Sequence, residues 1–133
     1  MTRYVVDARA AIELARRNVR ISADDELLAP TLIRSQTLSL LHEAVANGDM
    51  KEEVARDLHE RIGKMKMRLL GDAVLRRRAW AIASEMGWAS TFDAEYVALT
   101  QLQGDALVTL DKALARSVKG LVVTVPLKSI GAG

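Results

Sequence analysis

The sequence predicts a single α/β domain, spanning residues 1–133, in which helices flank a small parallel sheet of about four to five strands. Three observations lead to this class. The chain has 133 residues, which suits one domain. Short apolar segments alternate along it with longer segments of helical periodicity. Most of the apolar segments are continuous, which is typical of strands buried on both faces of a sheet.

The first part of the chain is predicted to fold as strand, helix, loop and helix. Residues 3–6 form a short apolar strand, and the Ala-rich residues 8–18 form a helix. Residues 19–29 are acidic in the middle, which predicts a loop. Pro30 suits the first turn of a helix over residues 31–46, because its missing N–H has no partner there.

The rest of the chain continues the alternation. Apolar periodicity and capping residues predict the helices, while period-two alternation and apolar runs predict the strands. In chain order we expect helix 51–62, strand 64–70, helix 73–86, helix 92–102, strand 106–109, helix 112–117, strand 121–125 and a loop over 126–133.

The composition excludes several classes of function. The sequence has no cysteine and two histidines, which excludes a disulfide scaffold, a thiolate metal site and a multi-histidine zinc site. A net charge of +2 permits a nucleic-acid partner without demanding one. Because the chain has neither a signal-peptide pattern nor a run of about 18 uncharged apolar residues, we expect a cytoplasmic protein without membrane contact.

Acidic side chains follow the predicted strands at the edge where parallel α/β sheets place their sites. Asp7 and Asp111 come after the two most apolar strands, and Asp93 opens a helix. If the three carboxylates converge, their repulsion favours a hard cation such as Mg²⁺ or Mn²⁺, the chemistry of phosphodiester hydrolysis. The plainer interpretation is that they cap helices, as we expect for Asp72, while Asp105 lies in a turn.

Four segments, in order along nearly the whole chain, carry a resemblance to a known family. Two of them are more specific: Asp-Ala-x-Tyr at the start of a helix, and Leu-Val-Thr-x-Asp about a dozen residues later. The four segments are 4–8 (YVVDA), 28–32 (LAPTL), 91–99 (TFDAEYVAL) and 106–111 (ALVTLD). The chain resembles PIN-domain proteins, and most closely the VapC-like toxins of bacterial toxin–antitoxin pairs. The resemblance implies a PIN-like fold, a Mg²⁺- or Mn²⁺-dependent endoribonuclease, a homodimer and inhibition by a small antitoxin.

The resemblance also implies a set of site residues. Asp7, Asp93 and Asp111 match the acidic positions of the family, and Thr109 matches a hydroxyl residue on the strand before the last acid. Gln36 stands where the family usually has a Glu. Its amide oxygen remains able to ligate a hard cation, with less attraction than a carboxylate. The departure puts the strength of the nuclease activity in doubt more than the fold.

Alternatives remain open at this stage. Because of Gln36, a catalytically weak PIN domain that acts by binding RNA or a protein is the first alternative. A phosphoacceptor domain is disfavoured, because a single Asp follows the first strand. Arg34 is the best candidate for contact with an RNA phosphate or an antitoxin carboxylate, ahead of the run at 76–78, which we interpret as a solvated helix face. Apolar residues on two sides of the 31–46 helix favour a homodimer, unless the 51–62 helix covers the second side.

Overall fold

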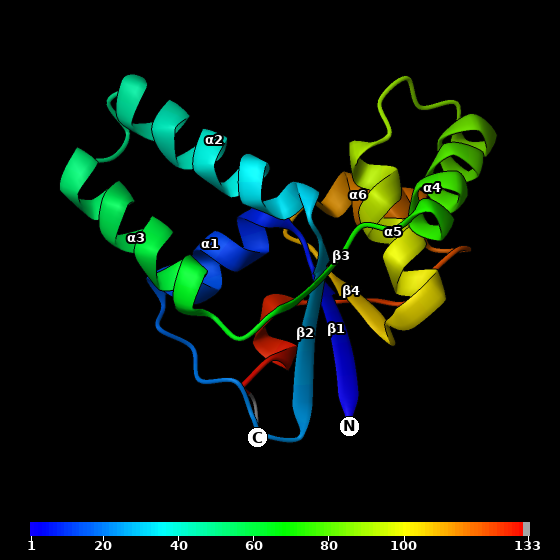
Figure 1. The fold of residues 1–133 in the computed structure, drawn as a ribbon, viewed down its shortest axis with the longest axis horizontal. Helices are drawn as coiled ribbons and strands as arrows, with labels where there is room; N and C mark the ends of the chain where they lie inside the picture. Colours follow the sequence, from blue (N-terminus) through cyan, green and yellow to red (C-terminus); the bar gives the residue numbers. More distant parts are fainter. Residues whose placement is uncertain (132–133) are drawn as a thin grey trace.

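The computed structural model describes residues 1–131, and within this range the chain forms a five-stranded parallel sheet flanked by helices (Figure 1). The strand order is β3-β2-β1-β4-β5. The elements are β1 (Thr2–Val6), α1 (Ala8–Arg16), β2 (Asp25–Pro30), α2 (Leu32–Ala46), α3 (Glu52–Lys64), β3 (Arg68–Leu70), α4 (Ala73–Met86), α5 (Phe92–Gln103), β4 (Ala106–Val108), α6 (Lys112–Ser117), β5 (Thr124–Val125) and a 3₁₀ turn over Leu127–Ser129. The predicted α/β fold class is therefore confirmed.

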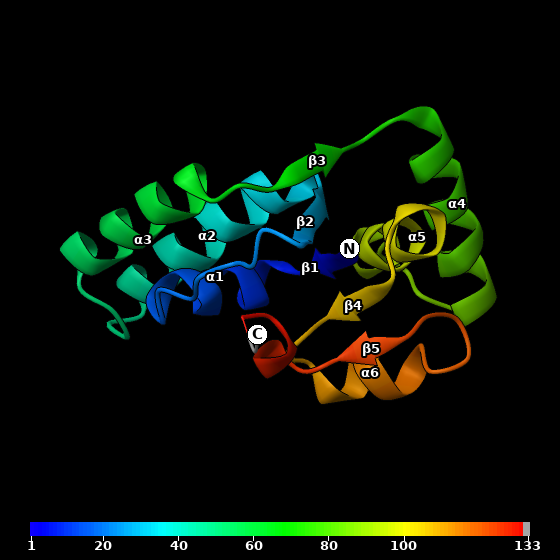
Figure 2. The ribbon, with the colours of Figure 1, turned by 90° about the horizontal axis from the view of Figure 1, so that it is seen from below.

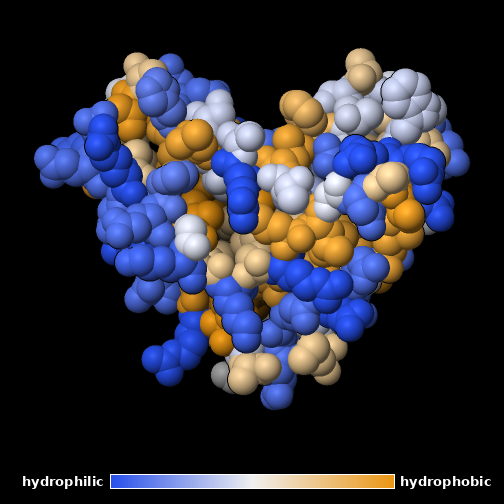
Figure 3. Space-filling model, in the orientation of Figure 1, coloured by the Kyte–Doolittle hydropathy of each residue, from blue (hydrophilic) through white to orange (hydrophobic). Residues whose placement is uncertain are grey.

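The sheet lies between two groups of helices. Helices α1, α2 and α3 lie on one side of it, and α4 and α5 lie on the other (Figure 2). The space-filling view shows that the molecule is notched between the arm built by α2 and α3 and the arm built by α4 (Figure 3). None of the helices in residues 1–131 is long and apolar enough to cross a membrane.

The core is densest around the central strands β1 and β4. Val5 and Val6 of β1 and Leu107 and Val108 of β4 are fully buried, with helices against both faces of the sheet. Val5 lies in register with Leu28 on one neighbouring strand and with Leu107 on the other. This burial accounts for the continuous apolar segments in the sequence, since neither face of these strands meets solvent.

The prediction of a loop over residues 19–29 was wrong for its second half. Residues 25–30 form β2, which pairs with both β1 and β3. The acidic residues that favoured a loop stand at the start of the strand, and Leu27 to Pro30 are buried. Pro30 is the last residue of the strand and not the first turn of a helix. Its position lies beyond the pairing with β1, so its missing N–H breaks no bond of that ladder.

Two predicted strands are shorter in the structure. Helix α3 continues to Lys64, so the strand predicted over 64–70 is reduced to Arg68–Leu70. The strand predicted over 121–125 is reduced to Thr124–Val125. The expected terminal loop contains a 3₁₀ turn whose Leu127 is buried in the core, and its residues 132–133 lie outside the described range.

Helix α3 covers much of the second apolar side of α2. Leu41 of α2 packs in a cluster with Ala55 and Leu58 of α3, and each of the three is at least nine-tenths buried. Leu38 remains 55% exposed. The sequence left two possibilities for the second apolar side of α2, a dimer interface or packing against this helix, and the structure shows the packing against α3. Leu38 is the large apolar side chain of α2 that remains exposed.

Candidate active site

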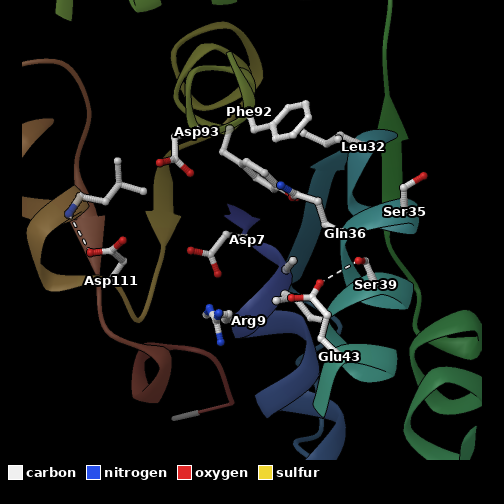
Figure 4. Close-up of a pocket in the computed structure, with 14 residues that line it drawn as sticks. Asp7, Arg9, Leu32, Ser35, Gln36, Ser39, Glu43, Phe92, Asp93 and Asp111 are labelled. Carbon is white, nitrogen blue, oxygen red and sulfur yellow. Dashed lines mark hydrogen bonds between the residues drawn. The ribbon is translucent and has the colours of Figure 1, made fainter. Parts of the chain in front are cut away.

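Three elements bring aspartates to the carboxyl edge of the sheet. Asp7 directly follows β1, Asp111 follows β4, and Asp93 lies in the first turn of α5. Since β1 and β4 are parallel neighbours with Val6 opposite Val108, the chain leaves both strands at the same edge. All three aspartates line one cleft of about 460 Å³, shown in Figure 4.

Two of these aspartates also cap helices. Asp7 Oδ1 accepts a hydrogen bond from the backbone N–H of Ala10 at 2.9 Å, and Asp111 Oδ1 accepts one from Leu114 at 3.0 Å. Asp93 makes no such bond, because Thr91 is the N-cap of α5. The plainer interpretation of Asp7 and Asp111 as helix caps is therefore correct, and it holds together with their place in the cleft.

Thr109 connects the two capping aspartates. Its Oγ1 accepts a hydrogen bond from the backbone N–H of Asp111 at 3.1 Å. Its hydroxyl also lies near enough to the side chain of Asp7 to lower the pKa of that carboxyl. Thr109 thus lies between the ends of β1 and β4 and contacts Asp111 directly, which is a positioning role.

The electrostatics of the cleft disfavour three separate negative charges. Burial raises the pKa of Asp7; the bonds from Thr109 and from the Ala10 N–H oppose the rise, and the charges of Asp93 and Asp111 add to it. Burial and the charge of Asp111 raise the pKa of Asp93. Because the carboxylates disfavour one another's ionised forms, either protons or a cation would relieve the repulsion.

The donor set fits a hard cation, but the side chains are not gathered around one point. The three acids offer carboxylate oxygens, which Mg²⁺ and Mn²⁺ prefer to sulfur or imidazole. Within residues 1–131, however, no three Asp, Glu or His side chains are close enough to hold one metal ion. A shared ion would therefore require these side chains to move together.

Comparison with known proteins identifies the fold. No family model and no curated protein matches the sequence. Among solved structures, the chain is similar to PAE2754 from Pyrobaculum aerophilum, with a TM-score of 0.77 and 23% identity over 96% of this chain and 91% of that one. It is also similar to VapBC2 from Rickettsia felis, with a TM-score of 0.68 and 8% identity over 94% and 98% of the two chains. The chain has a VapC-like PIN-domain fold. At these identities the likeness concerns the fold alone.

Gln36, for which the resemblance implies a Glu in the family, lies in the same cleft. Gln36, on α2, lines it opposite the aspartates. The hydroxyl of Tyr96, from α5, donates a hydrogen bond to Gln36 Oε1. Burial raises the pKa of Tyr96, and the charges of Asp7, Glu95 and Asp93 add to the rise, so the phenol keeps its proton as a donor. No signal in the sequence pairs these two residues, which are 60 positions apart.

The candidate contact Arg34 faces a different part of the PIN-like domain. It lines a separate groove with Thr37 and His59, between α2 and α3. The cationic side chain in the acidic cleft is that of Arg9, which sequence reasoning missed. Its position two residues after Asp7, at the start of the helix that follows the strand, is the signal that points to it.

A fourth carboxylate also lines the cleft. Glu43, about two turns beyond Gln36 on α2, lies farther along the same wall and accepts a hydrogen bond from Ser39 Oγ at 2.8 Å. The serine bond holds its carboxylate at the lower end of the cleft in Figure 4, away from Asp93.

Proposed function

We propose that this chain is a metal-dependent endoribonuclease and the toxin of a toxin–antitoxin pair, acting through Asp7, Asp93 and Asp111. The observation that carries the proposal is the convergence of three carboxylates, from three separate elements, on one cleft of a VapC-like PIN-domain fold. Two of these carboxylates have pKa values raised partly by their acidic neighbours, so the cleft has a net attraction for a dication.

Each of these residues would have a separate role in phosphodiester hydrolysis. Asp7, Asp93 and Asp111 would hold Mg²⁺ or Mn²⁺, which supplies a water of lowered pKa and charge stabilisation at the phosphate. Thr109 holds Asp7 and the Asp111 backbone in register. Arg9 gives the cleft a cation for the backbone of an RNA strand.

Asp93→Asn is the direct test of the site, because this aspartate caps no helix and its replacement should leave the fold intact. Its matched control is Glu95→Gln, a change of the same kind two residues along the same helix, at a residue outside the cleft lining. We expect the wild type and the control to cleave RNA in Mg²⁺ or Mn²⁺ and to stop in chelator. The Asp93→Asn variant should be inactive in both conditions; equal activity of both variants would refute the site.

The toxin assignment predicts a small antitoxin partner. The Rickettsia felis neighbour is the VapBC2 complex bound to a DNA fragment from its promoter. Arg34 lies outside the acidic cleft, so we assign it to an antitoxin carboxylate and not to the reacting phosphate. Expression of the chain should arrest growth, and co-expression of the small protein encoded beside it should relieve the arrest. Growth without arrest would contradict the toxin role.

We also propose that the protein is a homodimer. Large apolar side chains remain exposed on both arms of the molecule, including Leu38 at 55%, Phe92 at 53% and Trp80 at 72%. Exposed apolar groups of this size favour association. A mass of two chains at micromolar concentration is the expected result in light scattering, and a mass of one chain would refute it.

A catalytically weak domain that binds RNA or protein is the second candidate. Two observations favour it: the oxygen of Gln36 is engaged by Tyr96, and no three acidic groups in residues 1–131 are gathered for a metal ion. Binding of single-stranded RNA by the wild type, with no cleavage in either Mg²⁺ or Mn²⁺, would favour this function over the nuclease.

A further inference from the structure

We propose that Tyr96 orients Gln36 so that position 36 donates a hydrogen bond to a phosphodiester oxygen of the substrate and is not a ligand of the metal ion. The inference rests on the proposed function. It assigns a different ligand to each of the two sides of the acidic cleft. The aspartates of β1, β4 and α5 take the cation, while the α2 side takes the phosphate.

The contact between Gln36 and Tyr96 is set deep in the wall of the cleft. Tyr96 is 2% exposed, and its hydroxyl donates to Gln36 Oε1. Gln36 is half-buried and reaches from α2 toward the side of the cleft that holds Asp7 and Asp93 (Figure 4). A glutamine amide has one oxygen that accepts and one nitrogen with two protons to donate. Because the oxygen is turned toward the buried phenol of Tyr96, the nitrogen at the other end of the amide is the group available to a ligand in the cleft.

The opposite orientation of the amide is disfavoured by the needs of the phenol. If Gln36 turned its nitrogen toward Tyr96, the phenol would become the acceptor, and its own proton would need a new acceptor. Within residues 1–131, the Tyr96 hydroxyl has no other hydrogen-bond partner. A buried donor without an acceptor costs about 1–3 kcal/mol. Tyr96 is therefore a positioning residue that fixes which end of the amide faces the cleft.

The charge balance of the cleft calls for a donor at this position. Asp7, Asp93, Asp111 and Glu43 all line the space, so acceptors are in excess. An anionic phosphodiester bound there needs groups that donate, apart from the cation itself. Arg9 provides one such group, and the Gln36 nitrogen, for which residues 1–131 supply no hydrogen-bond partner, provides another.

Two binding affinities, measured on the 133-residue chain, separate the metal-binding role from the phosphate-binding role. Calorimetry with Mn²⁺ alone measures the affinity for the metal ion. Anisotropy measures the affinity for a labelled single-stranded oligoribonucleotide in Ca²⁺, and the oligonucleotide is checked afterwards to be intact. The variants are Gln36→Ala, the volume-preserving Gln36→Met, Tyr96→Phe, the double variant of Gln36→Ala with Tyr96→Phe, and Asp93→Asn. Tyr4→Phe is the control, because its hydroxyl bonds the Ser129 carbonyl away from the cleft.

We expect both Gln36 variants and Tyr96→Phe to weaken oligonucleotide binding by about tenfold, the loss of one hydrogen bond to a charged group. Their Mn²⁺ affinity should stay within about twofold of the wild type. The double variant should lose no more than Gln36→Ala alone, since Tyr96 acts through Gln36. Tyr4→Phe should change neither affinity.

Three results would overturn the inference. Loss of Mn²⁺ affinity in Gln36→Ala to the extent seen in Asp93→Asn would make Gln36 a metal ligand. Unchanged oligonucleotide affinity in both Gln36 variants would show that Gln36 does not contact the phosphate. Additive losses in the double variant would show that Tyr96 acts elsewhere. Failure of the proposed function looks different: Asp93→Asn would then bind Mn²⁺ as the wild type does, while the oligonucleotide measurements would still decide the role of Gln36.

Discussion

Strands β1 and β3 end in the same local structure, yet only the end of β1 belongs to the cleft. Asp7 and Asp72 have nearly the same backbone conformation, and each accepts a 2.9 Å hydrogen bond from the N–H three residues on. Asp7 lines the cleft, while Asp72 is exposed and does not. The difference is topological: β1 lies beside β4, which brings Asp111 next to Asp7, whereas β3 is at the edge of the sheet. A helix-capping aspartate becomes part of a site through its neighbours.

The strand between them, β2, gives the cleft something else. It is followed by α2, whose N-cap residue Thr31 makes no side-chain capping bond. The contribution of α2 near the aspartates is the amide of Gln36. The β1–β4 half of the sheet edge therefore carries the three aspartates, and the α2 wall carries the neutral amide of Gln36 near them, with Glu43 farther along.

Replacing Asp7 and Asp72 with asparagine, one at a time, should give the largest difference in RNA cleavage between the end of β1 and the end of β3. Asparagine caps helices about as well as aspartate, so both variants should fold. Asp7→Asn removes a charge that would hold the cation, and RNA cleavage should fall by about 100-fold or more. Asp72→Asn should cleave at the wild-type rate. Equal losses in single-turnover assays would mean that capping, and not the cleft, explains the effect of Asp7.

The acidic half of the edge could be predicted from the sequence because its signals are local. An apolar run followed by Asp marks the ends of β1 and β4, and Ser90 and Thr91 mark the start of the helix whose first turn carries Asp93. The strand β2 was missed because its acidic first residues resemble a loop and its Pro30 resembles the start of a helix. The strand is stabilised by pairing with β1 and β3, which no local pattern encodes.

The contacts that define the other wall of the cleft are equally non-local. Gln36 and Tyr96 lie 60 positions apart, and their hydrogen bond depends on how α2 and α5 meet across the edge of the sheet. Arg34 and Arg9 both lie in the first turn of a helix that follows a strand. Only the direction of each helix decides that Arg9 lines the cleft and Arg34 lines the groove beside α3.

Gln36→Glu should make the α2 wall resemble the acidic one. One oxygen of the new carboxylate would accept the Tyr96 proton, and the other would be available to the cation. At an effective dielectric near 20 the added attraction is about 1–3 kcal/mol, so Mn²⁺ affinity should rise by about tenfold. In chelator the variant should melt below the wild type, because a further half-buried negative charge has no counterion. Equal metal-induced shifts in melting temperature would place position 36 away from the ion.

A smaller difference is expected between the two arginines that follow β1 and β2. Arg9→Ala removes a cation from the cleft, and oligonucleotide affinity should fall by about fivefold at physiological salt, with a shallower dependence on salt concentration. Arg34→Ala should leave this affinity unchanged, because its groove is separate from the cleft. Salt titrations followed by anisotropy distinguish the two, and a stronger effect of Arg34 would move the RNA path to the α2–α3 groove.

The smallest expected effect is the pH dependence that the crowded acids impose on stability without metal. Burial and the neighbouring acids raise the pKa of Asp7 in the folded protein above its unfolded value. The folded state therefore holds this proton more tightly, and the stability it gains is fully present below the unfolded pKa, near 3.9. That gain is lost as the pH rises through the raised folded value. Asp7→Asn has no such proton, so in chelator the melting temperature of the wild type should fall relative to that of the variant as the pH rises from about 4 toward neutral. Adding Mn²⁺ at pH 7 should raise the melting temperature of the wild type and leave that of the variant nearly unchanged, since the cation replaces the proton as the partner of the carboxylates. A difference between the two proteins that stays constant with pH would show that Asp7 is ionised without cost, and its environment would then resemble that of the exposed cap at Asp72.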